Sequence, residues 1–368
     1  MFDIGRSKRA QRAYSLDEVS IVPSRRTRGV DQVDVAWKID AVAFEVPIVA
    51  APMDSVMSPA TAIEMGRLGG LGVLNLEGLW TRYDDPSDAL AELAAISHPV
   101  EATVAMQRLY AEPIKGELIR KRMDEIREAG VPAAGSLSPQ NTQAYAADVV
   151  ASNPDFFVIR GTAVSAEHVS EEVEPLNLKE FIYALDVPVI VGGCANYQTA
   201  LHLMRSGAAG VLVGFGGGAT GANKDVLGIE VPMASAITDV AEARRDYMAE
   251  SGGRYVHVIA DGGMGRSGAI VRALACGADA VMVGTPLARA QEAPGQGWHW
   301  GPEAWHATLP RGRRTRVEQV GTLEEVLYGP SRVTDGTMNL VGALRRAMAT
   351  TGYTDLKEFQ RIELVVHG

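Results

Sequence analysis

The chain has 368 residues, of which 46% are hydrophobic and 22% are charged, so the composition excludes a disordered chain and allows a large buried core. The 35 Lys and Arg residues against 45 Asp and Glu residues give a net charge of −10, which disfavours a general nucleic-acid-binding surface. The two cysteines, Cys194 and Cys276, have no metal-binding spacing, so we expect neither a disulfide framework nor a metal site.

The chain start carries basic residues, but a polar stretch follows where a secretory signal would have its apolar segment. No run of eighteen apolar residues occurs, so we expect no membrane span. Together with the few cysteines, this predicts a cytoplasmic protein.

Short, fully apolar segments alternate with helical patterns along the chain. Such segments predict strands of a parallel sheet that is buried on both faces. Eight strand–helix units predict a closed (β/α)8 TIM barrel, an α/β fold in which residues 1–368 form a single domain. A doubly wound open sheet is the alternative. The expected strands are residues 47–50, 72–74, 132–134, 156–159, 189–191, 211–213, 258–260 and 281–283.

An internal repeat favours the barrel over the open sheet. Residues 188–215 align with residues 258–285 without a gap, and each copy reads strand, Gly-Gly, helix, Gly-Ala, strand, Gly. No Gly-x-Gly-x-x-Gly motif opens the first strand–helix turn, as a dinucleotide-binding open sheet would require.

Two stretches interrupt this rhythm. Residues 78–130 are longer than one crossover needs and predict a helical excursion. Residues 286–335 predict a flap-like insertion that contains three tryptophans, Trp298, Trp300 and Trp305. The insertion is either a lid over the barrel mouth or a solvated or oligomer-contact loop.

Residues that directly follow the strands are the candidates for chemistry, because barrel active sites lie at the carboxyl ends of the strands. Asp261 ends the seventh strand, where the first copy of the repeat has Val191. A carboxylate there suits the two hydroxyls of a ribose, and the alternative is an N-cap for the next helix.

Glycines surround this candidate at the neighbouring strand ends. Gly262 and Gly263 after the seventh strand, with Gly284 and Thr285 after the eighth, let backbone N–H groups approach a phosphate. The alternative is that these glycines allow tight packing between a strand and its helix. Residues 214–223 after the sixth strand, which include Gly216 and Gly218, predict a loop that is mobile or wraps a ligand.

Several segments resemble the IMP dehydrogenase/GMP reductase family over nearly the whole chain, without room for inserted CBS domains. They are residues 14–23 (YSLDEVSIVP), 46–56 (VPIVAAPMDSV), 69–74 (GGLGVL), 260–263 (ADGG), 283–285 (VGT) and 340–345 (LVGALR). The pattern is most similar to short paralogues of the dehydrogenases in actinobacteria. The resemblance implies an oxidoreductase of GMP biosynthesis that uses NAD or NADP and forms a homo-oligomer, in this family a tetramer.

The resemblance also implies roles for the candidate residues. Asp261 binds the ribose of a purine mononucleotide, such as IMP, XMP or GMP. Its 5′-phosphate lies against residues 262–263 and 284–285, with Gly216 and Gly218 beside them. Met53 lies against the base.

The sequence departs from the family at the reacting centre. The family's catalytic cysteine, in the loop after the sixth strand, is Gly221 here, and its phosphate-contacting serine is Ala219. The acidic residue that ends the fourth strand is Arg160, and residues 286–335 contain no Arg-Tyr pair for the flap's water-activating dyad.

These departures leave three hypotheses. The chain is a nicotinamide-dependent oxidoreductase, in which Cys194 would be the only substitute thiol at this face. It is a non-catalytic nucleotide-binding or regulatory paralogue. Or it is a barrel enzyme for another phosphorylated substrate, with Arg160 as an anion ligand.

Overall fold

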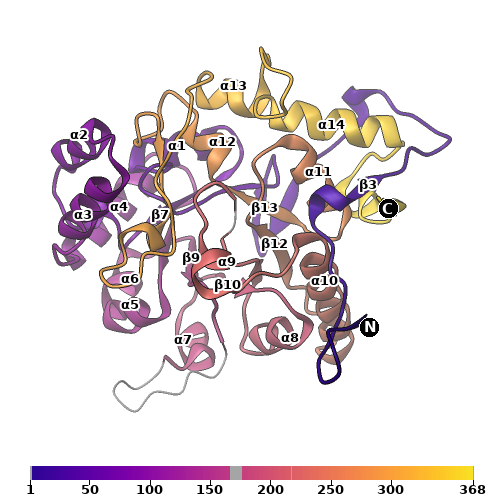
Figure 1. The fold of residues 1–368 in the computed structure, drawn as a ribbon, viewed down its shortest axis with the longest axis horizontal. Coiled ribbons are helices and arrows are strands. Elements are labelled where there is room, and N and C mark those ends of the chain that lie inside the picture. Colours follow the sequence, from indigo (N-terminus) through magenta and orange to yellow (C-terminus); the bar gives the residue numbers. More distant parts are fainter. Residues whose placement is uncertain (1, 166–175, 217, 368) are drawn as a thin grey trace.

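The fold is a closed barrel of parallel strands, seen in a computed structural model that describes residues 2–165, 176–216 and 218–367 (Figure 1). The hydrogen-bonded order is β10-β11-β12-β13-β6-β7-β8-β9, which closes because β9 also pairs with β10. The predicted (β/α)8 architecture is therefore confirmed. The strands are β6 (Ile48–Ala50), β7 (Leu71–Asn75), β8 (Ala134–Leu137), β9 (Phe156–Arg160), β10 (Val189–Cys194), β11 (Gly210–Val213), β12 (His257–Asp261) and β13 (Ala280–Val283).

Helices follow each barrel strand and cover the outside of the barrel. Nearly every strand residue is buried, because its side chain points either into the barrel or towards these helices. The covering helices are α1 (Pro59–Arg67), α4 (Gly116–Glu128), α6 (Ala146–Ser152), α7 (Leu178–Ala184), α8 (Tyr197–Arg205), α10 (Met233–Glu250), α11 (Ser267–Ala275) and α14 (Leu340–Thr351).

One strand begins later than the sequence indicates. The strand expected at residues 132–134 starts at Ala134 and continues to Leu137. Its true start is set by Asp155, whose carboxylate accepts a hydrogen bond from the backbone N–H of Ala133 at 2.8 Å. Gly135 and Ser136 are weak strand formers, and only their burial in the barrel explains why they belong to β8.

The amino ends of the strands are covered by a hairpin of β4 (Trp37–Ile39) and β5 (Val42–Phe44). Trp37 contacts His257 at the start of β12, with ring centroids 5.8 Å apart, and Phe44 contacts Phe156 at the same distance. This end of the barrel is therefore filled by aromatic side chains, which leaves the opposite end for a site.

The two ends of the chain meet on the surface. β3 (Val19–Ile21) pairs antiparallel with β16 (Leu364–Val366), with Ser20 opposite Val365. Helix α15 (Leu356–Phe359) precedes β16, and a small hairpin of β1 (Phe2–Asp3) and β2 (Arg9–Ala10) precedes β3.

The two interrupting stretches contact each other above the barrel. Residues 78–130 contain α2 (Ser87–Ala95) and α3 (Pro99–Leu109) in addition to α4. Residues 298–316, which we call the mouth segment, run from β14 (Trp298–His299) to β15 (Thr315–Arg316). A second hydrophobic cluster joins them and includes Leu79, Leu90, Leu93, Met106, Leu109, Tyr110, Trp300 and Ala304.

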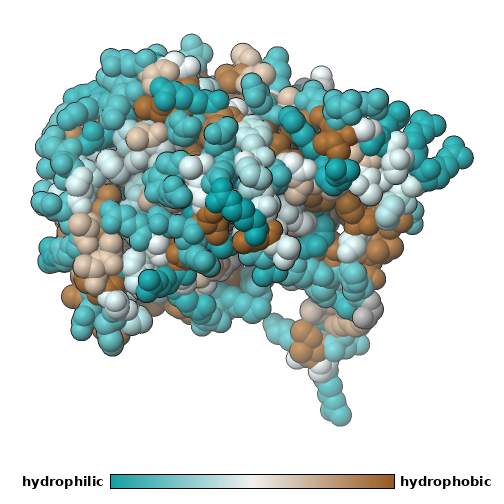
Figure 2. Space-filling model, turned by 90° about the horizontal axis from the view of Figure 1, so that it is seen from above, coloured by the Kyte–Doolittle hydropathy of each residue, from teal (hydrophilic) through white to brown (hydrophobic). Residues whose placement is uncertain are grey.

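The remaining short helices are α5 (Pro139–Ala144), α9 (Asn223–Leu227), α12 (Thr285–Ala288) and α13 (Leu323–Tyr328). The face of the molecule that Figure 2 shows from above is mostly hydrophilic, with hydrophobic residues in small separate groups. Within the described part of the chain, no helix is long and apolar enough to cross a membrane.

Candidate functional site

A cavity of about 130 Å³ lies at the carboxyl ends of β6, β11, β12 and β13. The structure brings all the nucleotide-site candidates together around it, although they come from four separate parts of the chain. Its lining includes Met53, Gly216, Gly218, Asp261, Gly262, Gly263, Gly284 and Thr285. Gly217, within the expected ligand loop, lies outside the described residues.

Asp261, the last residue of β12, forms a buried ion pair with Arg160, the last residue of β9. Nε of Arg160 donates a hydrogen bond to Oδ2 of Asp261 at 3.0 Å, and each side chain is only 6% exposed. Burial opposes the charged form of Arg160, but attraction to Asp261 and then to Glu303 raises its pKa. Asp261 does not cap a helix, because the N-cap of α11 is Arg266. The N-cap alternative is therefore wrong.

Glycine at two positions of the loop after β11 keeps this arrangement open. Gly216 has φ of +64°, and a Cβ there would lie 2.8 Å from Nη2 of Arg160. A Cβ on Gly218 would lie 3.6 Å from the backbone nitrogen of Gly263. No hydrogen bond of that N–H occurs among the described residues. The loop therefore leaves the Gly263 N–H free to meet an anion.

His299 of the mouth segment also lines the cavity, and no sequence pattern indicates it. Its Nδ1 lies 3.0 Å from Oγ of Ser55, and the residue is 1% exposed. Burial lowers the pKa of His299 to about 4, so the ring is neutral at physiological pH. Its Nε2 lies 3.5 Å from the position that a Cβ on Gly284 would take.

A hydrogen-bonded chain fixes the mouth segment above this site. The indole Nε1 of Trp300 donates to the hydroxyl of Tyr110 at 2.9 Å, and that hydroxyl donates to Oδ2 of Asp54 at 2.6 Å. Burial raises the pKa of Asp54 to about 6, although the hydrogen bond from Tyr110 opposes the rise. Trp298 donates to the carbonyl of Ala94 at 3.1 Å. Trp298 and Trp300 therefore pack the mouth segment against the stretch that contains α2 and α3.

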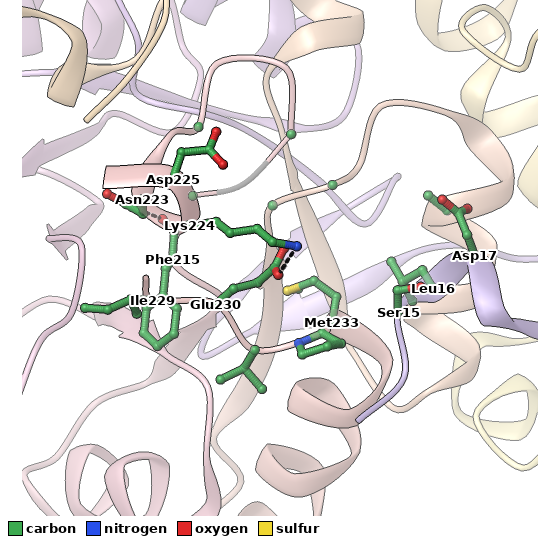
Figure 3. A pocket seen from close by; sticks show the side chains of 18 of the residues that line it. Ser15, Leu16, Asp17, Phe215, Asn223, Lys224, Asp225, Ile229, Glu230 and Met233 are labelled. Atoms are coloured by element: carbon green, nitrogen blue, oxygen red, sulfur yellow. Dashed lines mark hydrogen bonds and ion pairs between the residues drawn. The ribbon is translucent and has the colours of Figure 1, made fainter. Parts of the chain in front are cut away.

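A larger cavity of about 580 Å³ adjoins the first and shares Gly216, Gly218, Gly262 and Gly263 with it (Figure 3). Ser15 to Asp17 line one side, and the loop after β11 lines the other. Lys224 and Glu230, both in the segment after β11, form an ion pair of 2.5 Å in that wall. Because the first cavity is smaller than the roughly 300–1,000 Å³ of typical ligand sites, a ligand of nucleotide size would need both.

Gly221, at the position expected for the family's cysteine, forms an isolated antiparallel bridge with Gly312 of the mouth segment. The flanking bonds run from the N–H of Ala222 to the carbonyl of Arg311 at 2.9 Å and from the N–H of Arg313 to the carbonyl of Thr220 at 2.7 Å. The loop after β11 and the mouth segment are therefore joined by backbone at this point.

Both thiols of the chain are buried. The Sγ of Cys194 donates to the carbonyl of Leu212 at 3.4 Å, and burial raises the pKa of this thiol to about 12. Cys276 follows α11 outside the barrel, and burial raises its pKa to about 11. Neither thiol is ionised at neutral pH.

The family model described as IMP dehydrogenase / GMP reductase domain matches residues 13–367. The chain belongs to this family. An uncharacterized oxidoreductase of Mycolicibacterium smegmatis is 52% identical, and the alignment covers 100% of both chains. An inosine-5′-monophosphate dehydrogenase of Thermoplasma acidophilum is 26% identical over 95% of this chain and 90% of its own length.

A solved structure gives the same result. The chain resembles the crystal structure of an IMP dehydrogenase/GMP reductase-like protein from Corynebacterium glutamicum with a TM-score of 0.95 and 49% sequence identity. That likeness covers 100% of this chain and 97% of the other. The IMP dehydrogenase/GMP reductase fold therefore extends from end to end of this chain.

Sequence reasoning missed three features of this IMP dehydrogenase/GMP reductase barrel. It considered Arg160 only as a ligand for an external anion and did not predict its ion pair with Asp261. It missed His299, because a single histidine in an irregular segment carries no pattern. It also missed the buried chain from Trp300 to Asp54, whose only sequence signal is the aromatic content of both interrupting stretches.

Proposed function

We propose that this protein binds a purine 5′-mononucleotide at the ends of β12 and β13 and does not carry out thiol-dependent hydride transfer. Family membership supports the nucleotide, because the family is named for activities on IMP and GMP. The lack of a thiol that ionises at neutral pH supports the absence of thiol-dependent hydride transfer. The proposal chiefly rests on this observation.

The nucleotide would use the chemistry that lines the cavity. The carboxylate of Asp261 is oriented by Arg160 through Oδ2, and no hydrogen bond of its Oδ1 occurs among the described residues. A carboxylate oxygen in this state suits the two hydroxyls of a ribose. The free N–H of Gly263 beside Thr285 suits the phosphate, and Met53 offers an apolar contact for the base.

Covalent catalysis has no nucleophile here. Gly221 has no side chain, and the hydrogen bond from Cys194 to Leu212 turns its sulfur into the barrel wall. Loss of a nucleophile typically lowers turnover by several orders of magnitude. We therefore favour a binding or regulatory paralogue over an active dehydrogenase or reductase.

Membership of an oxidoreductase family implies NAD or NADP, but the residues beside Asp261 fit such a cofactor poorly. The nicotinamide ring of the oxidised cofactor is positively charged, and the guanidinium of Arg160 is buried directly beside the carboxylate. A positively charged ring placed against Arg160 would be repelled by its guanidinium. No step of the proposed function therefore depends on a nicotinamide.

Calorimetry with IMP, XMP and GMP tests the binding. We expect at least one of them to bind, and Asp261→Asn to weaken it by about 10- to 100-fold, since hydrogen bonds to a charged acceptor contribute roughly 1.5–3 kcal/mol. Glu318→Gln, an exposed carboxylate change on the far side of the mouth segment, is the control and should leave the affinity unchanged. Equal affinity of the Asp261→Asn protein would remove Asp261 from the site.

Nicotinamide absorbance tests whether the protein transfers hydride. Mixtures of IMP with NAD, and of GMP with NADPH, should show no turnover with the purified protein. Turnover in the ordinary enzyme range of about 1–1,000 per second would overturn the proposal. In that case Cys194→Ala would show whether the buried thiol takes part.

A further inference from the structure

A separate cavity of about 530 Å³ opens at the ends of β7, β8 and β9, on the other side of Arg160 from the nucleotide cavity. The mouth segment forms its outer wall. None of the candidate nucleotide residues lines it. The lining residues with polar or aromatic side chains include Asn75, Glu77, Ser136, Arg160, Thr162, Glu303, Trp305 and Arg311.

Arg160 offers unused hydrogen-bond donors to this cavity. Its side chain is 6% exposed, yet only Nε has a hydrogen-bond partner among the residues that the structure describes. The two terminal nitrogens carry four further N–H donors. Because Arg160 lines the cavity, these donors are available to a ligand that accepts hydrogen bonds.

The indole of Trp305 adds a donor of the same kind. Trp305 lines the cavity and stacks on Tyr110, with ring centroids 4.7 Å apart. Its Nε1 is buried and has no hydrogen-bond partner in the described part of the chain. The mouth segment therefore contributes both an aromatic wall and an unused N–H.

The cavity also holds charges of both signs, and among the described residues its carboxylates and guanidinium groups form no ion pair within 4.0 Å of one another, although Glu303 helps to raise the pKa of Arg160. Arg311 donates to the hydroxyl of Thr162 at 3.3 Å and to the carbonyl of Leu309 at 3.4 Å. Among the described residues, no carboxylate lies within 4.0 Å of the guanidinium of Arg311, and no Lys or Arg nitrogen lies within 4.0 Å of the carboxylates of Glu77 or Glu303. Opposite charges held apart in one cavity favour a ligand that carries both.

We propose that this cavity binds a small zwitterion of the free α-amino acid class. Its carboxylate would bind the guanidinium groups of Arg160 and Arg311, whose planar donors match a carboxylate. Its ammonium group would bind the carboxylates of Glu77 and Glu303. An anion without an amine would be repelled by the two glutamates, and an amine without a carboxylate would be repelled by the two arginines. This second site goes beyond the proposed function and does not depend on it.

A thermal-shift screen of the wild-type protein against each proteinogenic L-amino acid tests the proposal. We expect at least one to raise the melting temperature, because a ligand of the native state stabilises it by mass action. The matched deaminated acid and decarboxylated amine of that compound should bind at least about 10-fold more weakly. The proposal is wrong if no amino acid binds, or if either analogue binds as tightly as the amino acid.

Variants locate the site without disturbing the buried ion pair. Arg311→Gln and Glu303→Gln should each lower the affinity for the amino acid by about 10-fold or more. Arg316→Gln and Glu318→Gln, exposed changes on or next to the mouth segment, are the matched controls and should have no effect. Unchanged affinity in both Arg311→Gln and Glu303→Gln would assign binding elsewhere and overturn the proposal.

The same proteins separate this proposal from the proposed function. IMP affinity in Arg311→Gln and Glu303→Gln should equal that of the wild type, because neither residue lines the nucleotide cavity. Amino-acid binding without binding of IMP, XMP or GMP would refute only the proposed function. IMP binding without any amino-acid binding would refute only the second site.

Discussion

Nε of Arg160 lies 3.0 Å from Oδ2 of Asp261 and joins the ends of β9 and β12 across the mouth of the barrel. β10 and β11 separate these two strands in the sheet, so the pair spans the opening instead of following a strand edge. The pair also lies between two cavities. Asp261 lines the cavity of about 130 Å³, and Arg160 lines the cavity of about 530 Å³.

Breaking this pair should destabilise the protein. We expect Asp261→Ala to lower the free energy of unfolding by about 3–5 kcal/mol, because the guanidinium of Arg160 is then buried without its partner charge. The double variant Arg160→Met with Asp261→Leu should be more stable than Asp261→Ala, since neither charge remains. Urea unfolding measures both. A double variant less stable than Asp261→Ala would contradict this account.

Asp54 should give the stability an unusual pH dependence. Burial raises its pKa from 3.8 to about 6, so between these pH values the folded state holds a proton that the unfolded state releases. The free energy of unfolding should therefore fall by up to about 3 kcal/mol as the pH rises through this window, at 1.36 kcal/mol per pKa unit, and then stay level.

Asp54→Asn isolates this effect. The variant lacks the titrating group, so it should be more stable than the wild type at pH 7 and about equal to it near pH 4. The measurement is urea unfolding of both proteins across this range. Curves that run parallel at every pH would show that Asp54 does not titrate in this window.

Replacing Gly221 by cysteine should not create a dehydrogenase. The backbone at this position is joined to Gly312, and Arg160 still holds a positive charge beside Asp261. We expect Gly221→Cys to show no NAD reduction with IMP, measured by absorbance, although its IMP affinity should stay near the wild-type value. Appearance of turnover would show that the missing thiol is the only defect.

The tryptophans of the mouth segment should not hold subunits together. The family resemblance implies a tetramer, but Trp298 donates to Ala94 and lies under the guanidinium of Arg314, 3.6 Å from its ring centroid, within one chain. We therefore expect Trp298→Ser to have the same mass as the wild type by light scattering. A smaller mass for the variant would place this ring in a subunit interface.

The barrel was predictable because its strands are buried on both faces. That burial makes segments such as residues 189–191 and 281–283 entirely apolar, and such runs can be recognised in the sequence as strands. The start of β8 could not be predicted, since Asp155, 21 residues beyond Ala134, determines it.

The candidate residues at the strand ends could be predicted, because the carboxyl ends of barrel strands converge at one end of the barrel.

The contacts that depend on long-range pairing were not predictable. Tyr110 meets Trp300 across 190 residues, and both stretches are irregular, so neither has a periodic pattern that indicates its buried side. Arg160 and Asp261 were each noticed at a strand end, but on strands that only the closed barrel brings into register. A basic and an acidic residue at the same rim of a barrel are the signal that would have suggested their pair.

The antiparallel pair of β3 and β16 has a consequence for the newly made chain. β3 is translated long before its partner Leu364–Val366. At about 5–20 residues per second, roughly 20–70 s separate the two. The 580 Å³ cavity is lined by residues 15–18, which directly precede β3, so its wall stays without that support until β16 has been made. A chain cut short before β16 would carry all eight barrel strands with an unfinished cavity, and proteases that cut exposed chain ends would meet it there first.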